Sequence, residues 1–183
     1  MGHLHYALAM TDTDDPRLMV HQGHERETLC AFLDYHRHAL VRKLNGLSEE
    51  DARRRLVESN TTLLGIVRHL AEVERWWFRM VFRGEPISFR YIDMDKDPDG
   101  EWDLSLGGTL VDALAVYAEE CEVARSIVDA AGLDDIAQGR FESQNYFPDH
   151  NLRWILAHMI EETARHNGHA DILRELIDGT TGE

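Results

Sequence analysis

Cysteine, long apolar runs and an export signal are scarce or missing in this chain of 183 residues. Its two cysteines, Cys30 and Cys121, cannot build a disulfide framework, so we expect buried, small hydrophobic residues in a reducing compartment. No apolar run approaches the roughly 20 residues that a membrane helix needs. Residues 1–9 (MGHLHYALA) are too short and too weakly apolar for a signal peptide. We therefore expect a cytoplasmic protein with no membrane partner.

Positive charge is also scarce. The chain has 19 Lys and Arg against 34 Asp and Glu, which gives a net charge of −15 at pH 7 with neutral histidines. Nucleic acids and anionic lipid surfaces both bind through clustered cations, so this balance argues against either partner. Familiar catalytic signatures are missing too: the chain has no Gly-rich phosphate loop, no G-x-S-x-G and no C-x-x-C.

Helical periodicity is what the chain does have. Apolar residues recur every three or four positions in four long segments, which we expect to be helices over about 25–44, 61–82, 109–131 and 149–177. Asn45 and Gly46 end the first helix, and Ser48 begins a short one with a capping box. Strand-like alternation is scarce, so the sequence indicates an all-α protein.

Two irregular connections, residues 84–108 and 133–149, separate the later helices. The first is long enough to carry function, as long loops in compact domains often do. Hydrophobic residues make up 43% of the chain, which is enough for one core. The sequence therefore predicts a four-helix bundle with long crossover connections, forming one domain over 21–179 after a flexible leader over 1–20.

The last helix carries polar residues where its apolar stripe should continue. The stripe predicted to face the core, with spacings of four and three, is Ile155, Met159, Glu162, His166, His169 and Leu173. Glu162 and His166 lie four apart, so their side chains share one face of the helix. Burying an unpaired carboxylate costs several kcal/mol, so Glu162 must be paired, hydrogen-bonded or bound to a metal.

His69 occupies the same kind of position in the second long helix, between Ile66 and Val73. One cation bound by His69, Glu162 and His166 would satisfy all three side chains. Three protein ligands leave coordination positions open, which is typical of catalytic rather than structural sites. Two imidazoles and a carboxylate suit Zn²⁺, and also Ni²⁺, Fe²⁺ or Mn²⁺. Hydrogen-bonded core histidines and a solvated Glu-x-x-x-His pair would explain the same pattern without a metal.

Several neighbouring residues are open to two interpretations. His169 would be a fourth ligand, a group that orients a ligand, or a general base, and His158 could equally enter the site. Arg165 and Asp171 are either surface charges or groups that hold a substrate carboxylate and a ligand imidazole, respectively. Trp77 is either packed between helices or a wall of a substrate pocket.

Two segments resemble the DinB-like superfamily, namely residues 63–78 (LLGIVRHLAEVERWWF) and 161–171 (EETARHNGHAD). More closely, they resemble its actinobacterial mini-circle protein branch. The resemblance covers roughly residues 20–178 and implies a four-helix bundle that binds a metal through a histidine of the second helix and a pair on the last helix. The pair is Glu and His here, as in the mycothiol-dependent maleylpyruvate isomerase group, which implies His69, Glu162 and His166 as ligands. His169 departs from the pattern, since many members have Gln there.

The relatives in this superfamily include S-transferases and isomerases that use mycothiol or bacillithiol. The resemblance therefore implies a metal-dependent enzyme that acts with such a thiol on an electrophilic small molecule. His169 would be the catalytic base, while Arg165 and Trp77 would bind the thiol or the substrate. A metal-dependent hydrolase and a non-catalytic, stress-associated metal-binding protein are the alternatives. A homodimer is compatible with all of them.

Overall fold

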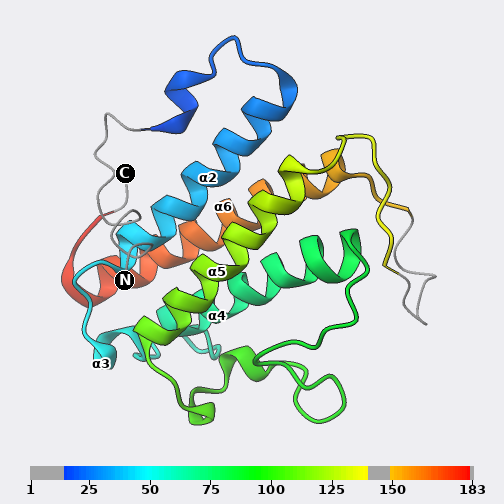
Figure 1. The fold of residues 1–183 in the computed structure, drawn as a ribbon. Helices are drawn as coiled ribbons and strands as arrows, with labels where there is room; N and C mark the ends of the chain where they lie inside the picture. Colours follow the sequence, from blue (N-terminus) through cyan, green and yellow to red (C-terminus); the bar gives the residue numbers. More distant parts are fainter. Residues whose placement is uncertain (1–14, 140–148, 182–183) are drawn as a thin grey trace.

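The computed structural model describes residues 15–139 and 149–181, and within these ranges the chain is helical (Figure 1). The long helices are α2 (Glu25–Leu44), α4 (Leu63–Glu74), which continues as the π-helix η3 (Arg75–Phe82), α5 (Leu110–Asp129) and α6 (Leu152–Asp178). The short helices are η2 (Pro16–Met19), α3 (Glu49–Ala52), η4 (Gly100–Trp102) and η5 (Leu104–Leu106). These ranges contain no strand, so the all-α prediction is confirmed.

The long helices form a bundle in which the two pairs with the most extensive contacts, α2 with α6 and α4 with α5, each run in the same direction. α2 packs along α6, α4 packs along α5, and α4 also contacts α6. Figure 1 shows that α2 is parallel to α6 and that α4 is parallel to α5. Because a short turn cannot join parallel neighbours, residues 83–109 return along the bundle before α5 begins. This segment, called the crossover below, is the long connection that the sequence predicts.

Local hydrogen bonds set the helix ends. The side chains of Ser48, Thr62 and Thr109 each accept a backbone N–H from the first turn of the following helix, at 3.0–3.1 Å. Gly179, with φ of 77°, ends α6 in the left-handed conformation. The predicted helices therefore agree with the observed ones to within a few residues at each end. The division into a leader and a single domain stays a prediction, since residues 1–14 lie outside the described ranges.

The sequence of the second long helix predicts a core stripe at Thr62, Ile66, His69, Val73, Trp76 and Met80, and the later part of this stripe is wrong. His69, Val73, Trp76 and Met80 are only partly buried. The buried residues of α4 instead extend almost all round the helix and include charged ones. α4 packs on α5 and α6 and is also contacted by η4 of the crossover, so it has no wide solvent-facing side that would define a stripe. α4 is therefore the central helix of the bundle.

In α6 the predicted core residues Ile155, Met159 and Leu173 are buried, but between Met159 and Leu173 the core side is shifted by one position from the predicted stripe. Thr163 and Asn167 are buried, whereas Glu162 and His166 are partly buried and His169 is exposed. The two buried polar side chains fit the core because each donates to a backbone carbonyl, at 2.7 and 2.9 Å. The prediction that placed Glu162, His166 and His169 on the core stripe was therefore wrong, because these residues lie at the edge of the core.

No helix in the part of the chain that the structure describes combines the length and the apolar character that a bilayer span requires.

A buried ion pair joins α2 to α4 near the middle of the bundle. Arg37 is 4% exposed and Glu74 is 1% exposed. Their contact is bidentate, with Nε to Oε1 at 2.7 Å and Nη2 to Oε2 at 2.6 Å. Asp34 of α2 accepts a further hydrogen bond from Arg37 at 3.0 Å. Because either charge would be very costly to bury alone, the pair fixes α2 relative to α4.

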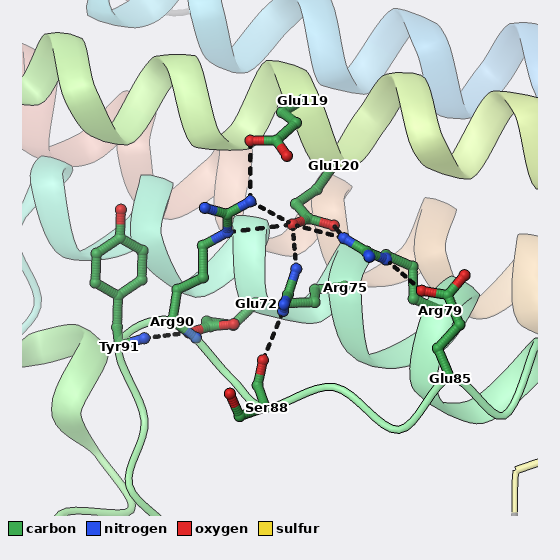
Figure 2. A network of polar contacts seen from close by, with 9 residues as sticks. All are labelled: Glu72, Arg75, Arg79, Glu85, Ser88, Arg90, Tyr91, Glu119 and Glu120. Atoms are coloured by element: carbon green, nitrogen blue, oxygen red, sulfur yellow. Dashed lines mark hydrogen bonds and ion pairs between the residues drawn. The ribbon is translucent and has the colours of Figure 1, made fainter.

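A second buried carboxylate, Glu120 of α5, gathers three arginines around it (Figure 2). Arg75 and Arg79 come from η3 and Arg90 comes from the crossover, with closest ion-pair distances of 2.6, 3.3 and 3.3 Å. Glu72 of α4 accepts the backbone N–H groups of crossover residues 90 and 91. Together these contacts hold the first half of the crossover against α4 and α5.

Removing one member of the buried pair should be strongly destabilising. We expect Glu74→Leu to lower the free energy of unfolding by about 3–5 kcal/mol, because Arg37 would lose its bidentate partner and keep its charge in the interior with only the single contact to Asp34. Adding Arg37→Met should restore much of the loss, since no unpaired charge then remains. Urea unfolding followed by circular dichroism measures both effects. Glu119→Gln is the control, because Glu119 is 56% exposed where it meets Arg90. Equal losses in Glu74→Leu and the control would contradict this account.

Candidate metal centre

His69, Glu162 and His166 come together where α4 packs on α6. The spacing of four in α6 puts Glu162 and His166 on one face, and His69 of α4 meets both. Oε1 of Glu162 lies 3.2 Å from Nε2 of His69 and 3.2 Å from Nε2 of His166. One ligand atom from each residue lies within 4.8 Å of the other two. The structure thus brings together the three residues that the sequence predicts as ligands.

Sequence reasoning missed two residues of this site, both from the crossover. Oε1 of Glu101 is 3.2 Å from Nδ1 of His69, and the Trp102 indole stacks on the His69 ring with centroids 5.3 Å apart. Glu101 is only 5% exposed, so a carboxylate is held in the interior behind the imidazole. A carboxylate at the far nitrogen is a usual partner of a metal-binding histidine, because it fixes the orientation of the ring. The only signal for it in the sequence is the length of the crossover.

Gly65 allows Trp102 to lie against α4. A Cβ atom at position 65 would be 2.6 Å from the Trp102 ring, which is closer than side chains tolerate. Gly65 is one turn before His69, so the glycine and the histidine form adjacent parts of the surface on which the indole packs. A glycine inside a helix lowers stability relative to alanine, and here it makes room for the ring.

His69 lies between two carboxylates, and this decides its charge. Burial alone lowers the pKa of the imidazole, but the hydrogen bonds with Glu101 and Glu162 outweigh burial and raise the pKa to about 9. Both ring nitrogens face carboxylate oxygens, so each needs a proton unless a metal cation replaces one of them. His69 is therefore positively charged at neutral pH when only protons are available.

The same arrangement acts in the opposite direction on Glu162. The hydrogen bonds with His166 and His69 hold the pKa of its carboxyl well below the usual range, so Glu162 is ionised at neutral pH. Its second oxygen, Oε2, accepts a hydrogen bond from Arg165 at 3.2 Å. Because Arg165 is 53% exposed, the carboxylate links the buried imidazoles to the rim of the site.

The donor set fits a divalent transition metal. Two imidazole nitrogens and a carboxylate oxygen converge, and a cation among them would take the place of the proton on Nε2 of His69. Nδ1 of His166 is buried and has no hydrogen-bond partner among the described residues, so this ring is held from its Nε2 side alone. A bond between the metal and a nitrogen of His166 would hold this ring in place more firmly. Three ligands would leave coordination positions open for a substrate.

Comparison with known proteins assigns the chain to a family. Residues 28–179 match the mycothiol-S-transferase family, and this span includes all three candidate ligands and the crossover. The chain belongs to the mycothiol-S-transferase family. The match agrees with the DinB-like, mycothiol-related resemblance of the sequence, while the mini-circle branch stays a prediction. No curated protein matches the chain.

In this member of the mycothiol-S-transferase family, His169 and Arg165 lie at the rim of the cluster. The ring of His169 is 5.3 Å from that of His166, and its side chain is exposed. Partial burial and the charges of His166 and Arg165 lower the pKa of His169, so its imidazole is neutral at pH 7. His169 is outside the group of three ligand atoms that the structure brings together.

The remaining candidates lie outside the cluster. His158 packs edge-on against Trp77, with ring centroids 4.7 Å apart. Trp77 is itself 7% exposed and belongs to the core between η3 and α6. Asp171 forms an ion pair with Lys43 of α2. Among the residues that the structure describes, Asp171 therefore makes the contact of a surface charge, and Trp77 makes the contacts of a residue packed between helices.

The stability of the metal-free protein should depend on pH through His69. Folding raises the pKa of His69 from 6.5 to about 9, so its charged form stabilises the folded state by up to about 3 kcal/mol. This contribution is complete below pH 6.5 and is lost as the pH rises through 9. In the presence of a chelator, the difference in unfolding free energy between wild type and His69→Gln should therefore shrink from pH 6 to pH 10.

His21→Gln is the matched control, because His21 is an exposed histidine far from the cluster in sequence. The control should follow wild type at every pH. A difference between wild type and His69→Gln that stays constant with pH would show that His69 gains no proton on folding.

Proposed function

We propose that the chain transfers a low-molecular-weight thiol, mycothiol or a close analogue, to an electrophilic small molecule. A divalent transition metal, with Zn²⁺ favoured over Ni²⁺, Fe²⁺ or Mn²⁺, would be held by His69, Glu162 and His166. The observation that carries the proposal is the convergence of these three ligand atoms within 4.8 Å, in a chain of the mycothiol-S-transferase family. Isomerisation of an electrophile would use the same activated thiol.

The chemistry requires a thiolate at neutral pH. A bound metal would supply it by lowering the pKa of the thiol. Glu101 would keep a proton on Nδ1 of His69 and so leave Nε2 unprotonated for binding. In S-transfer the thiol loses its proton, the sulfur bonds to the electrophilic carbon, and the leaving group departs with the electron pair of the broken bond. We expect His169, exposed beside His166, to accept the proton as the catalytic base.

Arg165 and Trp77 would contribute to binding in different ways. Arg165 is 53% exposed at the rim, where its guanidinium could hold a carboxylate of the thiol or of the electrophile. Burial of Trp77 favours support of neighbouring rings over direct contact with the thiol. A reduced thiol is abundant in the cytoplasm, which is the compartment we propose. A homodimer is compatible with this chemistry and is not required by it.

Metal content tests the ligand set directly. We expect about one equivalent of a transition metal in tag-free wild type, measured by plasma mass spectrometry. His69→Ala, Glu162→Ala and His166→Ala should each lose it, because two remaining ligands bind weakly. His158→Ala is the matched control on the same helix and should keep the metal. A wild type that takes up no Zn²⁺, Ni²⁺ or Mn²⁺ on reconstitution would overturn the metal site.

Thiol transfer is the second test. Wild type with mycothiol and monochlorobimane should form the fluorescent thioether, and a chelator should abolish this activity. His169→Ala should retain its metal but lose about 100-fold in kcat, as expected for removal of a general base. Turnover of an ester or amide without any thiol would favour the hydrolase instead. Metal binding without any turnover would favour the non-catalytic alternative.

A further inference from the structure

A row of aromatic side chains leads along α6 to the metal centre. His150, Trp154 and His158 precede Glu162 at successive spacings of four. Trp154 and His158 lie in α6, where residues four apart share one face, so they continue directly into Glu162 and His166, whereas His150 lies just before the helix begins at Leu152. At a rise of 1.5 Å per residue, His158 lies about 6 Å and Trp154 about 12 Å from Glu162 along the helix axis.

These rings pack on one another and on Trp77 of η3. The ring centroids of Trp154 and His158 are 5.1 Å apart and their planes differ by only 14°. His150 closes the other end, with its centroid 3.8 Å from that of Trp154. Trp77 contacts all three rings, at centroid distances of 5.6, 5.3 and 4.7 Å. We call these four residues the aromatic platform.

The platform has a buried side and an open side. Trp77 and His150 are 7% and 9% exposed, so they form its support. Trp154 is 44% exposed, and the side chain of His158 is 24% exposed. A large indole left open to solvent, yet held in place by three other rings, is a rigid surface on which a flat group can stack.

The chemistry of the platform limits the class of ligand that it can bind. Its four side chains include no carboxylate, ammonium or guanidinium group. The ionic contact at the end of the platform, 3.9 Å from Nδ1 of His158 to Glu161, is long, and Glu161 is engaged by Arg165. Stacking on the rings therefore favours a planar, weakly polar aromatic group.

We propose that the aromatic platform binds the aromatic part of the electrophile while the reactive carbon lies at the metal centre. This inference rests on the proposed function, because it specifies the second substrate of that reaction. Trp154 would stack on the ring of the substrate, and His158 would contact the end nearest Glu162. Because Trp154 lies about 12 Å from Glu162 along α6, the reactive carbon has to lie well beyond the stacked ring, so the substrate class is two-ring aromatic electrophiles that carry the reactive carbon on a short side chain.

The reaction balances for an α-bromo ketone that carries a biphenyl group, without any further reactant. A bond forms between the thiol sulfur and the methylene carbon, and the carbon–bromine bond breaks. Bromide leaves with the electron pair of that bond, and the thiol proton passes to His169 or to solvent. The neighbouring carbonyl group activates the methylene carbon for the attack.

Substrate selectivity tests the platform. With mycothiol as the thiol, Trp154→Ala should raise KM for 2-bromo-4′-phenylacetophenone about five- to tenfold, because the stacking partner of its outer ring is lost. KM for iodoacetamide, an aliphatic electrophile, should be unchanged. Trp154→Phe should recover most of the loss. Phe32→Ala removes an aromatic side chain of similar exposure, 39%, on α2 and is the matched control.

Binding without chemistry separates this inference from the proposed function. Calorimetric titration of the metal-loaded protein with 1,3-dinitrobenzene, which has no leaving group, needs neither thiol nor turnover. Wild type should bind this ring, and Trp154→Ala should bind it about five- to tenfold more weakly.

The titration and the KM measurements together distinguish failure of the platform from failure of the proposed function. If wild type binds 1,3-dinitrobenzene and Trp154→Ala does not, the platform is supported even if no thiol transfer is found, in which case the proposed function alone fails. If Trp154→Ala changes KM for both electrophiles equally, or for neither, the platform is overturned. Failure of wild type to bind 1,3-dinitrobenzene would overturn it as well.

Discussion

The buried charges of α4 are the constraint on which this fold depends. Arg68, Glu72 and Glu74 are each at most 2% exposed, and the interior of a bundle does not tolerate an unpaired charge. Glu74 meets Arg37 of α2, Glu72 meets backbone N–H groups of the crossover, and Arg68 donates to carbonyls further along the same segment. Moving α2 or the crossover would leave one of these charges alone. The position of both elements is therefore fixed by electrostatics as much as by apolar packing.

The metal centre follows from the same arrangement. His69 lies on the most buried helix, so its imidazole meets Glu162 from α6 on one side and Glu101 from the crossover on the other. Two carboxylates around one imidazole stabilise a positive charge between them, and either a proton or a metal ion can supply that charge. Protons and metal therefore compete for Nε2 of His69, and metal affinity is tied to pH. The carboxylates of Glu101 and Glu162 and the imidazoles of His69 and His166 therefore belong to one electrostatic unit.

Local features of the sequence were sufficient to predict the helices, and contacts across the bundle were not. Ser48, Thr62 and Thr109 cap their helices through bonds within three residues, which a sequence pattern can reveal. The three candidate ligands could also be found, because a spacing of four and a polar position in an apolar stripe are local signals. Glu101 was missed because its place beside His69 depends on the folded course of the crossover. Only the middle of the α6 stripe was misplaced by one position, because Thr163 and Asn167, both polar, face the core.

The crossover also makes the order of the site depend on how stably this one segment is held against the bundle. Closing a loop as long as residues 83–109 costs about 3 kcal/mol of chain entropy, which the anchors at Glu72 and Glu120 have to offset. Segments held by a few such contacts can open without the rest of the domain unfolding. When the crossover opens, His69 loses Glu101 and Trp102 together, while Glu162 and His166 keep their places on α6. The ordering of the imidazole is thus coupled to a sub-global folding equilibrium, and not only to the stability of the bundle.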